Sequence, residues 1–445
     1  MTIGTSILLT DLYELTMAQV YVEQEMLATA VFEFFIRKLP SHRGFLMTAG
    51  LEQVIEFLET LRFTEDELTW LEGTGRFSKR FLDYAEGLRF SGDVDGVPEG
   101  TVVFPHEPIL RITAPLPQAQ LVETRVMNLL HFQTLVASKA ARSVLVAAGK
   151  PLIDFGLRRA HGAEAGLLAA RASYLAGFSG TATVLAGQQF GIPIYGTMAH
   201  SYVQAHRDER DALAHFAEAQ PEQSVLLIDT YDTEAGARKV VELAAILNPR
   251  GISIRGVRLD SGDLAEHAHR VRRILDEGGL RHTQILASGN LDEYRVQSLV
   301  LGNAPIDSFA VGTAMTTSSD APALDCAYKL QEYDGRPCRK RSEGKATWPG
   351  RKQLYRRYDA DGFMAGDTVT LLDAPPPDGT PLLLPIMRGG RRLRSNGPLS
   401  DLRRHAATQL AALPVGLRHL HSPVSYRVEI ADPIRSLAQL VDASA

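Results

Sequence analysis

Residues 252–279 read ISIRGVRLDSGDLAEHAHRVRRILDEGG, and the fold that we predict follows from this pattern. The segment opens with a short apolar run and continues through a polar loop around Gly262. It ends in a stretch with apolar residues at helical spacing, such as Val271, Ile274 and Leu275. An apolar strand, a loop and an amphipathic helix in this order make the βα unit of parallel α/β proteins.

The same pattern recurs through the middle of the chain. Successive strand ends fall roughly 25–40 residues apart, which is typical of βα units. Unbroken apolar runs predict strands of a parallel sheet that is covered on both faces, and six such units in series favour a barrel over a doubly wound sheet. The other five runs are PLIDF (151–155), IPIY (192–195), SVLLID (224–229), TQILA (283–287) and DSFAV (307–311).

The two ends of the chain differ from this middle part. Residues 29–39 and 101–115 look like strands among helical stretches, and the last hundred residues or so carry short strands with Pro and Gly turns. Residues 120–148 predict one long amphipathic helix that leads into the barrel, and the basic segment 336–352 reads as a solvated linker. We therefore expect an N-terminal α+β domain at 1–115, an α/β barrel at 116–330 and a C-terminal segment at 331–445 that packs with the N-terminal domain.

Composition narrows the class of protein. The 445 residues are 45% hydrophobic and 22% charged, with a formal net charge of −5. This balance gives no general attraction to nucleic acid or to an anionic membrane, so an anion must be bound by local groups. No apolar run reaches the length of a membrane span, and the N-terminus lacks the pattern of a signal peptide. Two cysteines, Cys326 and Cys338, make neither a disulfide framework nor a zinc site, and we expect a cytoplasmic protein.

Two loops that follow the last strands predict phosphate binding. ASGN (287–290) places Ser288, Gly289 and Asn290 after one strand, and VGT (311–313) places Gly312 and Thr313 after the next. Small residues let backbone N–H groups approach a ligand, and barrels commonly bind phosphate after their last strands. Ordinary turn formation is the alternative for either loop taken alone.

The loop after the first strand, DFGLRRAHG (154–162), carries Arg158, Arg159 and His161. Paired arginines suit phosphates or carboxylates because the guanidinium group offers a fixed fork of donors. We expect one arginine to be structural, for instance in an ion pair with Asp154, and the other to contact the ligand.

VRLDSGD (257–263) gathers charges at one strand end. Arg258 and Asp260 lie two residues apart on a strand and so point to the same side. Together with Ser261 and Asp263 they could hold a carboxylated ring, a ribose diol and Mg²⁺, with Asp260 or Asp263 reaching the metal. The alternative is a simple ion pair, with Asp263 capping the next helix.

GTMAHS (196–201) places His200 and Thr197 after another strand. A neutral imidazole is a good phosphoryl acceptor near pH 7. Histidines are more often surface or core residues, which is how we interpret His206 and His215.

With these motifs in their order, the chain resembles the nicotinate phosphoribosyltransferases. The resemblance runs nearly end to end and implies an irregular (β/α) barrel of the type II phosphoribosyltransferase kind, with a smaller α+β domain built from both ends of the chain. The motifs that carry it are LLTDLYELTMAQ (8–19), FFIRKLPSHRGFLMTAGL (34–51), DFGLRRAHG, GTMAHS, IDTYDT, RLDSGD, ASGN, VGT and LPIMRGGRRL (384–393).

The resemblance implies a reaction in NAD salvage. Nicotinate and phosphoribosyl pyrophosphate (PRPP) would give nicotinate mononucleotide and pyrophosphate, with coupled hydrolysis of ATP in the presence of Mg²⁺. His200 would be the histidine that ATP phosphorylates, Arg258 the partner of the nicotinate carboxylate, and Tyr13 the residue that stacks on the ring. A homodimer with shared active sites is implied as well. The ribose, phosphate and further ligand contacts would fall to Asp260, Thr197, Ser288, Gly289, Gly312, Thr313 and Arg159.

Other enzymes remain as alternatives. The related nicotinamide phosphoribosyltransferase holds its amide with an aspartate in a GTDT segment, where this chain has GTAT (180–183) with Ala182. Quinolinate phosphoribosyltransferase is shorter and lacks the N-terminal TDLY segment. An unrelated phosphate-binding barrel, such as an aldolase, would need a lysine or an acid/base pair, and the six loops hold no lysine. A catalytically dead nucleotide sensor is disfavoured by the presence of His200, Arg258 and Asp260.

Overall fold

The chain folds into two compact units. A computed structural model describes residues 6–393, 397–421 and 424–444. Unit 1 combines Met1–Ser138 with Ala321–Ala445, and unit 2 is the continuous segment Lys139–Asp320. The terminal parts of the chain therefore make the unit with more residues, and the expectation that they form the smaller domain is wrong.

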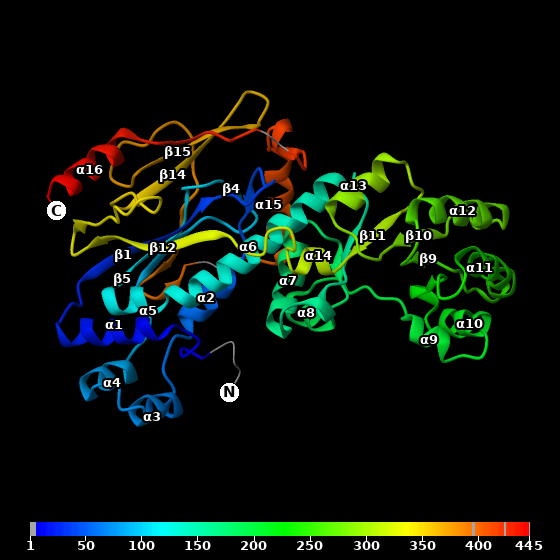
Figure 1. Ribbon diagram of the computed structural model, residues 1–445, viewed down its shortest axis with the longest axis horizontal. Helices are drawn as coiled ribbons and strands as arrows, with labels where there is room; N and C mark the ends of the chain where they lie inside the picture. Colours follow the sequence, from blue (N-terminus) through cyan, green and yellow to red (C-terminus); the bar gives the residue numbers. More distant parts are fainter. Residues whose placement is uncertain (1–5, 394–396, 422–423, 445) are drawn as a thin grey trace. The chain divides into compact units, whose positions relative to one another are not determined.

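Unit 2 is built on a six-stranded parallel sheet, drawn in green and yellow-green in Figure 1. The strand order is β7-β6-β11-β10-β9-β8, and among the described residues the two outer strands, β7 and β8, do not pair with each other. The sheet is therefore a half-barrel, which confirms the predicted barrel only in part. The strands are short and mostly buried, as in a sheet with cover on both faces. They are β6 (Leu152–Asp154), β7 (Gly180–Thr181), β8 (Val225–Leu227), β9 (Gly256–Leu259), β10 (Gln284–Ala287) and β11 (Ser308–Val311).

Helices follow these strands as the periodicity predicts. Helix α12 (Leu264–Glu277) starts where the Asp263 carboxylate accepts hydrogen bonds from the backbone N–H groups of Ala265 and Glu266, and its residues Val271 and Leu275 are buried. The other α-helices of unit 2 are α7 (Ala163–Ala176), α8 (Val184–Phe190), α9 (His200–Gln204), α10 (Glu209–Ala219), α11 (Thr233–Leu247), α13 (Glu293–Leu301) and α14 (Thr313–Thr316).

Two predicted elements of unit 2 are wrong. Residues 192–195 form a single bridge from Ile194 to Thr181 instead of a strand, because Pro193 has no N–H to continue a ladder. The neighbouring strand is β7, whose two residues carry no apolar run. The helix predicted beyond His200 is two helices, because Asp208 accepts a hydrogen bond from the Arg210 N–H and starts α10 anew.

Unit 1 holds a seven-stranded sheet of order β13-β12-β1-β5-β3-β17-β18, in which β12 from the C-terminal part pairs antiparallel with β1 along its length. Its strands are β1 (Thr29–Lys38), β3 (Asp93–Gly96), β5 (Pro108–Pro115), β12 (Asp325–Tyr333), β13 (Arg336–Pro337), β17 (Leu384–Arg388) and β18 (Arg391–Arg392). The smaller sheets contain β2 (Leu46–Met47), β4 (Val102–Val103), β14 (Lys352–Tyr358), β15 (Met364–Leu371), β16 (Thr380–Pro381) and β19 (Val428–Ile430). The helices of unit 1 are α1 (Leu12–Glu23), α2 (Leu51–Glu59), α3 (Glu65–Gly73), α4 (Lys79–Glu86), α5 (Leu116–Leu121), α15 (Leu399–Ala411) and α16 (Asp432–Ala443).

The long helix predicted at 120–148 is α6 (Glu123–Val146), preceded by the short α5, and the boundary between the units falls within it. The basic segment 336–352 is not simply solvated. Lys352 is buried and its ammonium lies 2.9 Å from the Glu33 carboxylate, while Arg339 pairs with Asp442 at 3.2 Å. In the described part of the chain, no helix is long and apolar enough to span a membrane.

Candidate functional site

The carboxyl ends of the parallel strands gather polar side chains around Arg258. Arg258 lies on β9 and is only 8% exposed. Its Nε donates to Ser288 Oγ at 2.8 Å, one Nη donates to Thr197 Oγ1 at 3.1 Å, and the other donates to Asp260 Oδ1 at 2.7 Å. These contacts fix the plane of the guanidinium group before any ligand arrives.

Asp260 is ionised and held from three sides. Burial alone would raise the pKa of its carboxyl group. The hydrogen bond from Ser288 and the charge and hydrogen bond of Arg258 outweigh burial, so the pKa lies below its usual value. The backbone N–H of Asp260 and the hydroxyl of Ser261 both donate to Asp229 Oδ2, at 2.8 and 2.6 Å. Asp229, two residues after the end of β8 at Leu227, thus holds the loop that carries Asp260 in place.

His200 begins α9 beside this cluster. Its Nδ1 is hydrogen bonded to Thr230 Oγ1 at 3.1 Å, and its Nε2 lies 3.8 Å from Asp260 Oδ2. The side chain is 38% exposed, so a ligand can reach the imidazole. An imidazole that is oriented by one partner and faces an ionised carboxylate can accept a phosphoryl group or a proton.

The two predicted phosphate loops lie on neighbouring strands, after β10 and β11. Gly289 has φ +87°, and a Cβ there would meet the Asp260 backbone oxygen at 1.8 Å. A Cβ on Gly312 would meet the Phe155 backbone oxygen at 2.9 Å. These glycines therefore allow each loop to touch the loop of another strand, which brings the strand ends into one site.

Asp154 anchors the loop after β6, but to other partners than we expected. Its carboxylate accepts hydrogen bonds from Thr181 Oγ1 and from the Gly156 N–H, each at 2.7 Å, instead of pairing with an arginine. Burial raises the pKa of Asp154 to about 6, against the lowering effect of these two hydrogen bonds. Arg158 and Arg159 lie in the short helix Leu157–Arg159 and are exposed, as is His161.

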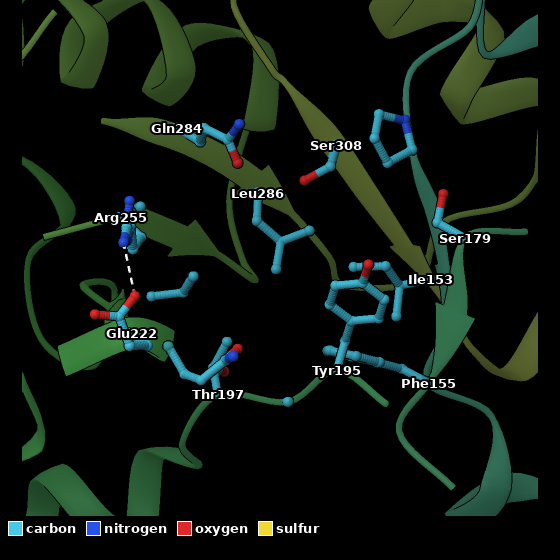
Figure 2. Close-up of a pocket in the computed structure, with 15 residues that line it drawn as sticks. Ile153, Phe155, Ser179, Tyr195, Thr197, Glu222, Arg255, Gln284, Leu286 and Ser308 are labelled. Atoms are coloured by element: carbon cyan, nitrogen blue, oxygen red, sulfur yellow. Dashed lines mark hydrogen bonds and ion pairs between the residues drawn. The ribbon is translucent and has the colours of Figure 1, made fainter. Parts of the chain in front are cut away.

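A cavity of about 310 Å³ lies inside the half-barrel, toward the amino ends of the strands. Figure 2 shows Ile153 and Tyr195 beside Phe155 at one side and the Arg255–Glu222 ion pair at the other. The cavity touches the Arg258 cluster through Phe155, whose ring centroid is 5.4 Å from the guanidinium carbon, and through Thr197. Because His200, Asp260 and the glycine loops lie at the opposite ends of the strands, the cavity extends the site and is not its centre.

The remaining predicted residues fall in three places. The carboxylate of Asp263 caps α12 and accepts two backbone hydrogen bonds there. Asn290 and Thr313 lie in the two glycine loops. Tyr13 lies on α1 of unit 1 and is 45% exposed. Burial and the nearby Glu123 raise the pKa of Tyr13, so its ring stays uncharged.

Three site residues escaped the sequence analysis: Phe155, Asp229 and Thr230. Phe155 and Asp229 are the last residues of the predicted strand runs 151–155 and 224–229, and Thr230 follows the second run directly; this position at a strand end was the available signal.

Asp229 and Asp260 offer oxygens that suit Mg²⁺. Asp229 Oδ1 is buried without a hydrogen-bond partner among the described residues, and Asp260 Oδ2 faces His200. The described part of the chain contains no group of three or more His, Cys, Asp or Glu side chains that could hold a metal. A metal here would therefore need oxygens of the substrate to complete its coordination.

The cluster combines a fixed cation, an ionised carboxylate, an accessible imidazole and two glycine loops. Such a set can bind an anionic ring and a phosphorylated sugar together. Thr230, His200 and Asp260 do not form a triad of the Ser–His–Asp kind, because the Nε2 of His200 lies 3.8 Å from Asp260 Oδ2, beyond hydrogen-bonding distance. The chemistry that the cluster favours is substitution driven by charge stabilisation.

Comparisons with known proteins agree with this geometry. Residues 8–131 match the model of the nicotinate phosphoribosyltransferase N-terminal domain, and residues 151–336 match that of the nicotinate phosphoribosyltransferase family. The chain is 51% identical to the nicotinate phosphoribosyltransferase pncB2 of Mycobacterium tuberculosis over 429 residues, which cover 96% of this chain and 92% of the relative. It is 39% identical to the nicotinate phosphoribosyltransferase of Bacillus subtilis over 82% of this chain and 76% of that protein.

A solved structure shows the same fold. The human nicotinic acid phosphoribosyltransferase superposes with a TM-score of 0.88 at 28% identity, over 97% of this chain and 99% of that chain. Sequence, fold and the residues around Arg258 lead to one conclusion: the chain belongs to the nicotinate phosphoribosyltransferase family.

Proposed function

We propose that this chain transfers the phosphoribosyl group of PRPP to nicotinate in NAD salvage, forming nicotinate mononucleotide and pyrophosphate, with ATP hydrolysis coupled through a phosphorylated His200. The observation that carries the proposal is the fixed guanidinium group of Arg258 between Asp260, Ser288 and Thr197, with His200 alongside. Family membership supports the identity of the substrates.

In this proposal the acid of the ring lies against Arg258. The Nη atom that bonds Asp260 carries a second N–H, and the Thr197 hydroxyl lies beside the other Nη, so a carboxylate could receive two hydrogen bonds. The ring would lie near Phe155, whose face is turned toward the guanidinium group. Ala182, directly after β7, brings no group that would hold an amide instead.

The phosphoribosyl group would lie across the neighbouring strand ends. Its phosphate would meet the loops at 288–290 and 312–313, and a ribose hydroxyl would donate to Asp260. The exposed Arg158, Arg159 and His161 of the loop after β6 would contact the same anion. Mg²⁺ held by Asp260 and Asp229 would neutralise the charge of the pyrophosphate.

Bond changes in the transfer need little from the protein. The pyridine nitrogen attacks the anomeric carbon of the ribose, and the carbon–oxygen bond to pyrophosphate breaks with its electron pair leaving on oxygen. No general base is required, because the attacking nitrogen carries no proton. The protein contributes orientation and electrostatic stabilisation of the leaving group.

ATP enters through His200. Transfer of the γ-phosphoryl group breaks a phosphorus–oxygen bond of ATP and forms a phosphorus–nitrogen bond on the imidazole, which water later cleaves. Two negative charges added beside Asp260 would change how tightly the site holds PRPP and its products. The net reaction then adds ATP hydrolysis to the transfer and has the character of a ligase.

Tyr13 would act in a homodimer. It is exposed on α1 beside the exposed Leu12, an apolar face that a second copy of the chain could cover. We propose that Tyr13 of one subunit stacks on the ring bound by its partner. Mixed dimers of Tyr13→Ala and His200→Ala subunits would then regain activity at one of their two sites. The two free cysteines agree with a reducing compartment, and we place the reaction in the cytoplasm.

One assay tests the proposal. The purified chain is incubated with PRPP, ATP and Mg²⁺ and with either nicotinate or nicotinamide, and the mononucleotide is measured by chromatography. We expect product from the acid only. Product from the amide in preference to the acid, or from neither, would overturn it.

A further inference from the structure

A buried charge cluster in unit 2 takes no part in the chemistry described so far. Lys139 of α6 lies with its ammonium 2.7 Å from Glu293 Oε2 and 2.7 Å from Asp320 Oδ1. Arg142, one turn further along α6, places its Nε 3.0 Å from Glu293 Oε1. We call these four residues the α6 clamp.

Three of the four clamp residues are deeply buried, and the fourth, Asp320, is partly exposed. The side chains of Lys139 and Glu293 are 2% and 0% exposed, and that of Arg142 is 5% exposed. Two cations and two carboxylates balance in charge, which a buried site requires. A buried ion cluster is often no more stabilising than an apolar one of the same volume, but removal of one partner leaves an uncompensated buried charge, so each partner holds the others in place.

The two carboxylates of the clamp belong to the two glycine loops. Glu293 is the first residue of α13, directly after the loop that begins at Ser288, and Asp292 between them caps this helix. Asp320 follows α14, which begins at Thr313 after Gly312. Lys139 therefore contacts the segments that follow both glycine loops. It lies 154 residues before Glu293 and 181 residues before Asp320 in the sequence.

Lys139 and Asp320 are also the first and last residues of unit 2. Their ion pair joins the points where the chain enters and leaves this unit. One lysine thus holds the ends of the unit and both glycine loops in a single arrangement.

We propose that Lys139 is a positioning residue that preorganises the two loops for the phosphate groups of PRPP. This inference rests on the proposed function, because that function assigns PRPP to the loops. A loop that is already fixed loses less conformational entropy when the ligand binds, so affinity for the phosphate end rises. The ring end should change less, because Ser288, where one loop meets Arg258, is also held by Asp260 and by the Leu259 carbonyl.

The test compares two lysines of unit 2. Lys139→Met keeps the length of the side chain and removes its charge. Lys239→Met is the matched control, because Lys239 also lies 2.7 Å from a buried carboxylate, that of Glu209, but joins α11 to α10 away from the loops. Asp320→Asn is a milder variant on a partly exposed carboxylate, for use if Lys139→Met does not fold.

We expect Lys139→Met and Asp320→Asn to raise KM for PRPP about tenfold, with KM for nicotinate changed less than about twofold. Their effects should not add in the double variant, because they remove the same contact. Lys239→Met should leave both constants unchanged. Equal rises in both KM values, or no rise for PRPP in a folded variant, would overturn the inference.

Hydrogen exchange gives a readout that needs no substrate. In Lys139→Met, the amides of residues 288–301 and 312–320 should exchange faster together, while those after β8 and β9 keep their rates. Unchanged exchange in both segments would overturn the clamp even in an active enzyme. If the wild-type chain makes no mononucleotide from PRPP, the proposed function fails, and hydrogen exchange still decides whether Lys139 couples the loops.

Discussion

Replacing Arg258 by glutamine tests the ring site most sharply. The change removes the positive charge and the hydrogen bonds to Asp260, Ser288 and Thr197, which lie at 2.7 to 3.1 Å. For the ligand, it removes charge-assisted hydrogen bonds to the nicotinate carboxylate. A hydrogen bond to a charged group contributes about 1.5–3 kcal/mol, so kcat/KM for nicotinate should fall about 10- to 150-fold.

The assay is a steady-state measurement of mononucleotide formation with saturating PRPP and ATP. Arg250→Gln is the matched control, because Arg250 lies outside the cavity in the short helix Asn248–Arg250, is more than half exposed and pairs with Glu218 on the surface. It should change kcat/KM less than about twofold, as expected for a surface ion pair. A folded Arg258→Gln enzyme with unchanged kcat/KM for nicotinate would refute the assignment of Arg258 to the ring acid.

Three further predictions concern the loops and the coupling. His200→Ala should lose labelling by γ-phosphate-labelled ATP and keep slow ATP-independent synthesis, whereas His215→Ala should keep both; labelling that survives in His200→Ala would place the phosphoryl group elsewhere. Because burial raises the pKa of Asp154 from 3.8 to about 6, the folded protein binds this proton more tightly than the unfolded chain, and its contribution to stability falls as pH rises from about 4 to about 6. The difference in unfolding free energy between wild type and Asp154→Asn should therefore shift by up to about 3 kcal/mol across that window in urea titrations, and a difference that does not depend on pH would contradict the burial argument. Gly289→Ala should cost activity and more stability than Gly149→Ala, since both have φ near +80° but only a Cβ on Gly289 meets backbone; equal melting temperatures would count against the close approach of the loops.

The sequence predicted the strands whose apolar runs are unbroken. The strands at 284–287 and 308–311 could be predicted from their own apolar side chains, because a strand of a parallel sheet is buried on both faces. Strand β7 was missed because its two residues, Gly180 and Thr181, have no apolar run and are held by partners distant in sequence. The bridge at Ile194 shows the opposite case, an apolar run that Pro193 keeps from forming a strand.

For the site, spacing was enough to pair Arg258 with Asp260, because i and i+2 share a face of a strand. It could not find Asp229, whose function is to bind a backbone N–H and a hydroxyl 31 and 32 residues away. The predicted ion pair between Asp154 and an arginine was wrong for the same reason. The carboxylate of Asp154 accepts a hydrogen bond from Thr181 of the neighbouring strand β7, a contact that the sequence does not reveal. Contacts of this kind, between residues distant in sequence, could not be predicted from the sequence alone.

The central claim is that nicotinate and the phosphoribosyl group meet at the carboxyl ends of β9, β10 and β11. A crystal structure of the chain with nicotinate mononucleotide bound measures this directly. We expect the ring carboxylate within hydrogen-bonding distance of Arg258 and the phosphate against the loops at 288–290 and 312–313. A mononucleotide bound away from Arg258, or with its phosphate outside both loops, would contradict the account.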